Sequence, residues 1–287
     1  MKYIIEPKNL TQFKKFLNKP QITDLRIGLE EVSSGLIFKM NIDDLNVYLQ
    51  KMDTAKISLQ ITRIFHESEL DNLKKIFLKL NWPKIKFIFY SDLGVYEVIK
   101  KLGYVNKLVY DANTYMTNAS DINFFLKLNQ YVVVSNQISY YEMDELLKKV
   151  TRPTIIYGFG KSTIFYSKRP LLRNYFLYRN LNYAYNEPNY YLKEEYRNDF
   201  YHIYEDQHGS YVYEPKFYYL FDELFMLKNV EYAIISCVDM KSKLFEQVVN
   251  GYLQNNSSFL LTNPDMFYKG ILKEKSVLLK NEVAKNE

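Results

Sequence analysis

The sequence is poor in cysteine, histidine and glycine, and this scarcity excludes several kinds of site. Cys237 is the only cysteine among 287 residues, so the chain forms no internal disulfide and cannot by itself hold zinc or an iron–sulfur cluster through thiolates. The three histidines, without a G-x-S-x-G elbow, do not indicate a Ser-His-Asp triad. Nine glycines are few for a barrel that binds phosphate in its last loops.

Long apolar runs are also lacking. No stretch reaches the ~18 uninterrupted apolar residues of a membrane span, and Glu6 and Lys8 interrupt the apolar start of the chain. We therefore expect no membrane span, no signal peptide and a cytoplasmic location.

Aromatic residues, in contrast, are abundant, with 28 tyrosines and 19 phenylalanines. The accompanying excess of Lys, Asn and Ile is typical of an AT-rich genome, and the alternative is a surface that stacks on bases or flat ligands. The formal net charge of +5 is compatible with an acidic partner such as RNA without requiring one.

Short runs rich in β-branched and aromatic residues recur along the chain, and several lack the polar alternation of a half-exposed strand. The eight runs are Lys2–Ile5, Leu25–Leu29, Ile57–Ile61, Lys86–Tyr90, Lys107–Tyr110, Tyr131–Val134, Thr154–Gly158 and Glu231–Ser236. Amphipathic patterns between them, such as 67–80 and 141–150, predict helices. The predicted fold is α/β, a (β/α)8 TIM-like barrel.

The spacing of these runs predicts the domain organisation. The first seven recur every roughly 20–30 residues, which is the length of one βα unit. Residues 159–230 then form a long insertion between strands seven and eight, with no Gly/Ser/Pro linker. We expect a barrel over 1–254 and a short C-terminal extension over 255–287 that packs on it. Asn9 with Gln12, Asp43-Asp44 and Ser120-Asp121 are predicted helix caps.

The stretch GFGKST, residues 158–163, resembles the end of a nucleotide-binding P-loop. The full pattern requires a glycine where Ile155 stands, and it requires a helix after the lysine. Thr163–Tyr166 is strand-like instead, so an ATP site is not predicted.

Candidate site residues lie where the predicted strands end, because the functional face of a barrel is its C-terminal face. The residues just past the strands are Glu6, Glu30, Arg63, Asp92, Asp111, Asn113, Asn136 and Lys161. Arg63 suits a carboxylate or phosphate. Asp92 and Asn136 either face the pocket or cap helices, and the sequence leaves both alternatives open.

The stretch 157–175 interleaves Lys161, Lys168, Arg169 and Arg173 with aromatic residues such as Tyr166. This pattern is typical of RNA binding, in which charges contact phosphates and rings stack on bases. The alternative, which we favour slightly, is a packed aromatic loop with solvated cations. Arg169 and Arg173 could instead hold a small dicarboxylate by bidentate contacts.

The motif EDQHG contains Glu205, Asp206 and His208. With His202 these side chains could form a non-haem iron site, but adjacent side chains rarely converge on one ion. A tight structural turn before a strand is favoured. For Cys237 we favour a buried structural role over a reactive thiol.

The order of motifs along the chain resembles the collagenase-like peptidase family U32. The resembling segments are 2–17, 87–103, 132–147, 157–175, 201–213, 238–253 and 267–280, and they include the Tyr-Ser, Arg and Leu-Leu steps after strand seven and the Glu-Asp-x-x-Gly segment. The resemblance implies a (β/α)8-like barrel and, in the better understood members, oxygen- or prephenate-dependent RNA hydroxylation. It also implies four cysteines that hold an iron–sulfur cluster.

Two of those cysteine positions correspond to Thr163 and Pro170, which cannot ligate iron, and Cys237-Val238-Asp239 stands where the family has Glu-Gly-Arg. This departure resembles short, cysteine-poor bacterial members that occur beside a cysteine-bearing paralogue and are linked to hydroxylation of the tRNA wobble uridine. We therefore expect a partner subunit without its own cluster, whose partners are that paralogue, tRNA or a small carboxylate. The alternatives are a metal-dependent collagenase-like peptidase and a degenerate, non-catalytic interaction protein.

Overall fold

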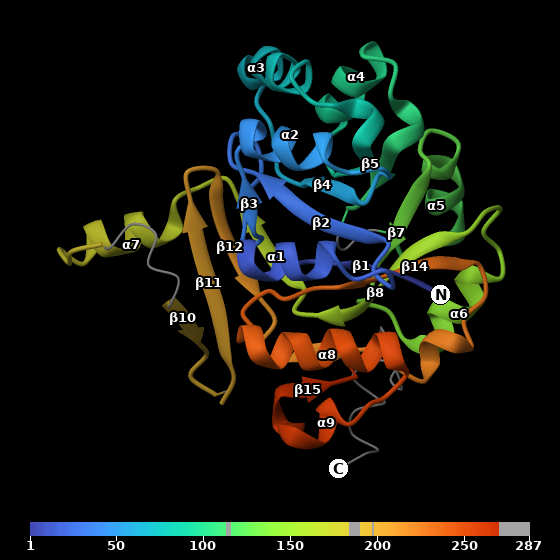
Figure 1. Cartoon of the computed structure of the whole chain (residues 1–287). Helices are drawn as coiled ribbons and strands as arrows, with labels where there is room; N and C mark the ends of the chain where they lie inside the picture. The colour runs from blue at the N-terminus through green and yellow to red at the C-terminus, as the bar shows by residue number, and fades with distance from the viewer. Residues whose placement is uncertain (113–115, 184–189, 197, 270–287) are drawn as a thin grey trace.

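Eight parallel strands form a closed barrel in the computed structural model, which describes residues 1–112, 116–183, 190–196 and 198–269 (Figure 1). In spatial order they are β1 (Lys2–Ile5), β2 (Asp24–Leu29), β4 (Ile57–Ile61), β5 (Ile85–Tyr90), β6 (Leu108–Tyr110), β7 (Tyr131–Val134), β8 (Thr154–Gly160) and β14 (Val230–Ile235). Strand β14 pairs with both β8 and β1 and so closes the ring. The predicted TIM-like barrel and all eight of its strands are confirmed.

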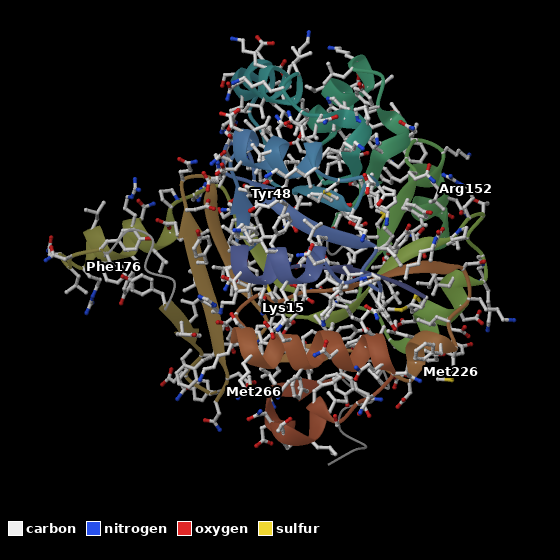
Figure 2. All side chains as sticks on the ribbon, in the orientation of Figure 1. Lys15, Tyr48, Arg152, Phe176, Met226 and Met266 are labelled. Atoms are coloured by element: carbon white, nitrogen blue, oxygen red, sulfur yellow. The ribbon has the colours of Figure 1, made fainter. Side chains whose placement is uncertain are left out.

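Helices surround the barrel and bury one apolar face each against it (Figures 1 and 2). They are α1 (Leu10–Leu17), α2 (Ile42–Gln50), α3 (Glu67–Phe77), α4 (Leu93–Lys101), α5 (Ala119–Leu126), α6 (Tyr140–Leu147) and α8 (Ser242–Gln254). Lys15 and Tyr48, labelled in Figure 2, lie on two of these helices. Most of the hydrophobic core therefore lies between the sheet and this ring of helices.

The helix caps were predicted only in part. Asn9 caps α1 as predicted, since its side chain accepts a hydrogen bond from the Gln12 amide. The predictions of Asp43-Asp44 and Ser120-Asp121 as caps were wrong. Asn41 and Asn118 cap those helices instead, because an N-cap needs extended backbone and the predicted residues already lie in the first helical turn.

A second, smaller sheet is formed by the insertion between β8 and β14. Its antiparallel strands are β10 (Tyr190–Lys193), β11 (Phe200–Asp206), β12 (Gly209–Tyr213) and β9 (Thr163–Ser167), in this spatial order. Figure 1 shows it at the end of the barrel toward which the parallel strands point. Helix α7 (Leu171–Tyr178) packs on its outer face and projects away from the barrel, with Phe176 labelled in Figure 2. We call α7 the arm.

Short strands extend the barrel sheet at its margins. Strand β3 (Lys39–Met40) adds to β2, β13 (Phe217–Tyr219) pairs antiparallel with β8, and β15 (Phe267–Tyr268) pairs with β13. Helix α9 (Phe259–Thr262) brings Phe259 against Phe159, Tyr252 and Phe267. The predicted C-terminal extension is thus described as far as residue 269, and residues 270–287 lie outside the described part. No helix in the described part is both long and apolar enough to cross a bilayer.

The barrel interior is aromatic at its N-terminal end and polar toward its C-terminal end. Phe87, Tyr131 and Tyr232 meet edge to face with ring centroids 5.4–5.7 Å apart. Near them Asp24 is fully buried, accepts a hydrogen bond from the Ser58 hydroxyl at 2.8 Å, and lies 3.6 Å from the Lys86 ammonium. Burial raises the pKa of Asp24 to about 6, against the opposing effect of Lys86 and Ser58.

The raised pKa predicts a pH-dependent loss of stability. The folded state binds the Asp24 proton more tightly than the unfolded state, so the free energy of unfolding falls as pH rises from about 4 to about 6. We expect D24N to remove this contribution, which amounts to at most about 3 kcal/mol. In urea unfolding, the free energy of unfolding of D24N minus that of the wild type should increase as pH rises across this range. A difference that does not change with pH would contradict the assignment.

Candidate functional site

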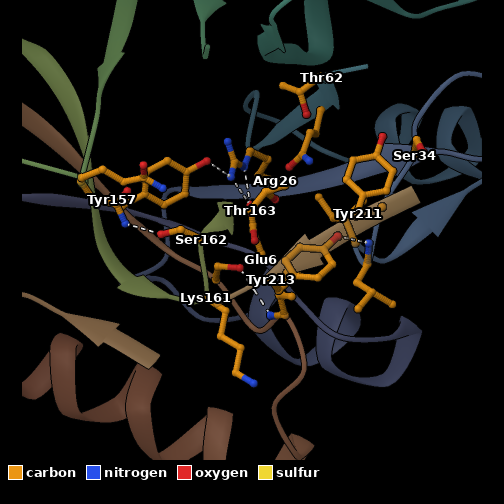
Figure 3. A pocket seen from close by; sticks show the side chains of 18 residues that line it. Glu6, Arg26, Ser34, Thr62, Tyr157, Lys161, Ser162, Thr163, Tyr211 and Tyr213 are labelled. Carbon is orange, nitrogen blue, oxygen red and sulfur yellow. Dashed lines mark hydrogen bonds and ion pairs between the residues drawn. The ribbon is translucent and has the colours of Figure 1, made fainter. Parts of the chain in front are cut away.

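A polar pocket lies at the C-terminal mouth of the barrel, beneath the small sheet (Figure 3). Strand-end residues such as Glu6, Asn136 and Lys161 form one side, and Tyr211 and Tyr213 of the small sheet form the other. The pocket is narrow and only partly open, and its volume of about 50 Å³ is space for a few water molecules. The small sheet therefore covers the position where ligands bind in barrels of this class.

Arg26 stands at the floor of this pocket, on β2, and is buried. Its guanidinium donates to Glu6 and, at 2.8 Å, to the Asp111 carboxylate, and it lies 4.7 Å from the centre of the Phe89 ring. The Tyr157 hydroxyl accepts from Arg26 at 3.3 Å and donates to Asp111 at 3.1 Å. Although burial opposes it, Glu6, Tyr157 and Asp111 raise the pKa of Arg26, which keeps it charged.

The pattern of strand-end residues predicted Glu6 and Asp111 but missed Arg26. The sequence offered one signal, a charged side chain within the otherwise apolar run LRIGL. In a barrel strand, such a side chain can be buried only if it faces the barrel interior. Two carboxylates and one guanidinium give this cluster a formal charge of minus one, so its cation is already satisfied by the protein.

Lys161 forms a second, half-buried ion pair at the mouth. Its ammonium lies 2.6 Å from Asp239, and the other oxygen of that carboxylate lies 3.2 Å from Nδ1 of His202. Asp239 has a φ of +58°, a left-handed conformation that is uncommon for residues other than glycine. Burial opposes ionisation, but His202 and Lys161 hold the pKa of Asp239 below its usual range. The three residues join β8, β11 and the end of β14.

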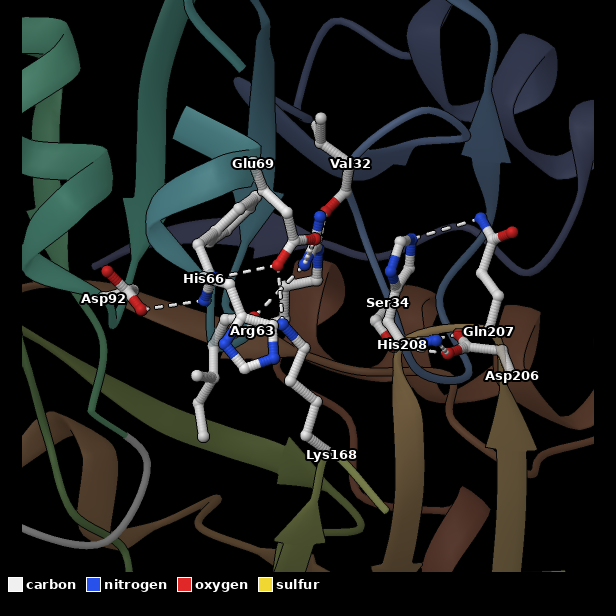
Figure 4. Close-up of polar contacts among 12 residues, drawn as sticks. Val32, Ser34, Arg63, His66, Glu69, Asp92, Lys168, Asp206, Gln207 and His208 are labelled. Carbon is white, nitrogen blue, oxygen red and sulfur yellow. Dashed lines mark hydrogen bonds and ion pairs between the residues drawn. The ribbon is translucent and has the colours of Figure 1, made fainter. Parts of the chain in front are cut away.

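Arg63 lies outside the mouth, against α3 (Figure 4). It is buried, donates to the Val32 carbonyl at 2.8 Å and to Glu69 at 2.8 Å, and stacks 3.7 Å from the Phe65 ring centre. The Lys168 ammonium lies 2.6 Å from the other Glu69 oxygen. Despite desolvation, Lys168, the His66 backbone and Arg63 lower the pKa of Glu69 to about 2. The carboxylate partner expected for Arg63 is thus provided by this chain.

Of the two alternatives for Asp92 and Asn136, the structure shows a helix cap for Asp92 and a pocket position for Asn136. Asp92 caps α4, with one oxygen accepting from the Gly94 amide at 2.7 Å and the other from the Phe65 amide at 2.9 Å. Asn136 lines the mouth and donates to the Ser162 hydroxyl at 2.6 Å. Asn113 lies outside the described residues.

The EDQHG motif forms the tight turn between β11 and β12. Glu205 and Asp206 are neighbours on a strand, so their side chains point to opposite faces and cannot converge on one ion. Gly209 has a φ of +140°, and a Cβ there would lie 2.2 Å from the Ser167 carbonyl oxygen. In the described ranges no three His, Cys, Asp or Glu side chains are grouped to hold a metal. The favoured interpretation as a turn agrees with this geometry.

Each carboxylate of this motif anchors a different part of the structure. Glu205 is buried and accepts from the Leu172 amide and the Ser210 hydroxyl, both at 2.8 Å, at the start of the arm. Asp206 accepts from the Ser34 hydroxyl at 2.8 Å, the Gly35 amide at 3.2 Å and Lys39 at 3.3 Å. It therefore ties the loop after β2, which lines the mouth, to the small sheet.

The remaining candidates lie on the small sheet and the arm. Tyr166 stacks on Tyr211 with ring centroids 4.5 Å apart and donates to the His208 carbonyl at 3.1 Å. His208 is half-buried, and burial together with Arg63 lowers its pKa. Arg169 and Arg173 are exposed at the start of the arm. The candidates thus fall at the mouth, at the Glu69 cluster and on the arm, not in one cleft.

The residues at the expected cluster positions do not fit an iron–sulfur cluster. Thr163 begins β9 and lines the mouth, whereas Pro170 follows the far end of that strand and precedes the arm. Four residue steps of a strand already span ~13 Å. Cys237 is buried beyond β14, and burial raises the pKa of its thiol, which keeps it protonated. GFGKST continues into strand β9, as predicted, and not into a P-loop helix.

Comparison with known proteins identifies the family. Residues 25–263 match the model of Peptidase family U32. The chain belongs to peptidase family U32. It is 23% identical over 183 residues to the tRNA hydroxylation protein P2 of Bacillus subtilis (strain 168), and this alignment covers 62% of the chain and 59% of that protein. No solved structure matches the chain.

The Arg26 cluster predicts a specific stability pattern. R26M leaves Glu6 and Asp111 buried without their cation, so we expect a loss of about 3–5 kcal/mol in the free energy of unfolding. The triple variant E6Q/R26M/D111N removes the unpaired charges together and should recover most of this loss. Urea unfolding of both variants checks the prediction. If the triple variant were no more stable than R26M, unpaired charge would not be the cause.

Proposed function

We propose that this U32 protein acts in tRNA hydroxylation as a subunit without its own iron–sulfur cluster, beside a cysteine-bearing paralogue. The observation that carries the proposal is the retained barrel with Thr163 and Pro170 at the expected ligand positions. The similarity to a tRNA hydroxylation protein supports the choice of RNA as the substrate class.

The charge arrangement supports RNA over a small carboxylate. At the mouth, Arg26 and Lys161 are already paired with carboxylates of the chain. Arg169 and Arg173 are exposed at the start of the arm and do not line the pocket at the mouth, where a small dicarboxylate would be desolvated and held. Exposed lysines such as Lys216, Lys241 and Lys243, in an open groove beside the mouth, suit the phosphate backbone of a large polyanion.

The geometry gives no support to the peptidase named in the family title. Glu205 and Asp206, which could have served a metal or an acid–base pair, point in opposite directions and hold the arm and the loop after β2. Cys237 is buried as a neutral thiol, so it is unsuited to nucleophilic attack.

Deleting the gene in its native host tests the proposed function. Mass spectrometry of tRNA nucleosides should show loss of hydroxylated wobble uridine in the deletion strain, with recovery when the gene is restored on a plasmid. Deleting the paralogue alone should give the same loss, because we propose that both chains are required. Unchanged hydroxylation in the strain that lacks this gene would overturn the proposal.

A further inference from the structure

The barrel mouth and two neighbouring hollows lie in a row along the junction between the small sheet and the barrel, and we call this row the trough. The mouth shares Gly35, Leu36 and Ile37 with a neighbouring hollow of about 390 Å³. That hollow shares Lys8 and Asp239 with an open groove of about 930 Å³, beside α8 and the β10–β11 end of the small sheet. Tyr191, Phe200 and Met266 line the open groove, and Met266 is labelled in Figure 2.

The two larger parts of the trough concentrate positive charge. Their lining includes six lysines and three aspartates, and Lys39 and Lys161 are paired with Asp206 and Asp239 within the protein. The lysines are Lys8, Lys39, Lys161, Lys216, Lys241 and Lys243, and the aspartates are Asp199, Asp239 and Asp265. This density of cations along one channel is the electrostatic pattern of a polyanion site.

Three of these lysines are available to a ligand. Lys216, Lys241 and Lys243 are exposed, and within the described ranges their ammonium groups form no ion pair or hydrogen bond. Lys8 and Lys161, by comparison, donate to the Met240 carbonyl and to Asp239. The outer groove therefore carries cations that the protein does not neutralise.

Aromatic rings line the same side of the trough. Successive strand residues alternate faces, so His202, Tyr204, Tyr211 and Tyr213 face the barrel, while the intervening residues pack under the arm. Tyr191 stacks on His202 with centroids 5.1 Å apart and remains 47% exposed. One face of Tyr191 is thus supported by the protein, as in a platform for a base.

We propose that the trough binds a single-stranded segment of RNA and leads it toward the barrel mouth. Lys216, Lys241 and Lys243 contact its phosphates, and Tyr191 stacks on a base. This inference rests on the proposed function and specifies which surface holds the substrate. Paired bases are stacked in a duplex and are unavailable to Tyr191, so the trough selects unpaired nucleotides. The arm, on the outer face of the small sheet, does not line this path.

Charge removal in the groove is the first test. We compare K216Q/K241Q/K243Q with the wild type for binding of a fluorescein-labelled oligouridine of about 12 nucleotides, by anisotropy over a salt series. Losing three phosphate contacts should lower affinity about 10- to 100-fold near 0.1 M salt and make the slope of log K against log salt about 2 less negative.

A matched control carries the same charge change elsewhere. K74Q/K101Q/K127Q removes three exposed lysines from the outer helices and should bind like the wild type. Equal loss in both variants would overturn the trough as the RNA site, and so would loss only in R169Q/R179Q, which removes the exposed arginines on either side of the arm. Stronger competition by polyglutamate than by unlabelled oligouridine would also overturn it, in favour of an acidic peptide.

Stacking is tested separately. Y191A should weaken oligouridine binding by about fivefold or more, with little change in the salt slope, because it removes a base contact and no charge. Y141A, which removes a 72% exposed ring from α6, is the control and should have no effect. Unchanged binding by Y191A would contradict the base platform.

The two proposals fail in different ways. If K216Q/K241Q/K243Q keeps wild-type RNA affinity while gene deletion still abolishes tRNA hydroxylation, the trough is wrong and the proposed function stands. If the variant loses RNA affinity while deletion leaves hydroxylation intact, the trough binds RNA and the proposed function is wrong.

Discussion

Two adjacent carboxylates on β11 fix the small sheet over the barrel, and the rest of the site depends on this constraint. Because neighbouring strand residues face opposite ways, Glu205 holds the arm on one face while Asp206 holds the Ser34–Gly35 turn on the other. The turn lines both the mouth and the adjoining hollow. A Glu-Asp-x-x-Gly segment thereby closes a barrel end that would otherwise be open, and Gly209 provides the tight turn that brings β12 alongside.

Charged side chains at the mouth are paired within the protein, whereas those of the open groove are not. Arg26 and Lys161 neutralise carboxylates of the chain in surroundings with little water, where an unpaired charge is costly. The lysines of the open groove remain solvated and unpaired, so they can exchange water and counterions for phosphate at low cost. The open groove therefore supplies most of the free energy of RNA binding, whereas the mouth is a polar site whose charges are already paired.

Local sequence patterns predicted the barrel because its strands are apolar on both faces and its helices are amphipathic. They did not predict how the insertion folds, since pairing β9 with β12 depends on contacts more than 40 residues apart. Among strand-end residues, Asn136 and Lys161 reach the mouth, whereas Arg63 and Asp92 turn toward α3 and α4. Arg26 was missed because it lies within a strand, and only the closure of the barrel shows that its side chain points inward.

Crosslinking shows directly whether RNA follows the trough to the mouth. Ultraviolet irradiation of the wild-type protein with a uridine-containing anticodon stem–loop, followed by mass spectrometry, identifies the residues that touch unpaired bases. We expect crosslinks at Tyr191, Phe200 and the peptide that contains Lys241. Crosslinks confined to Tyr175 and Tyr178 of the arm, or to the outer helices, would contradict it.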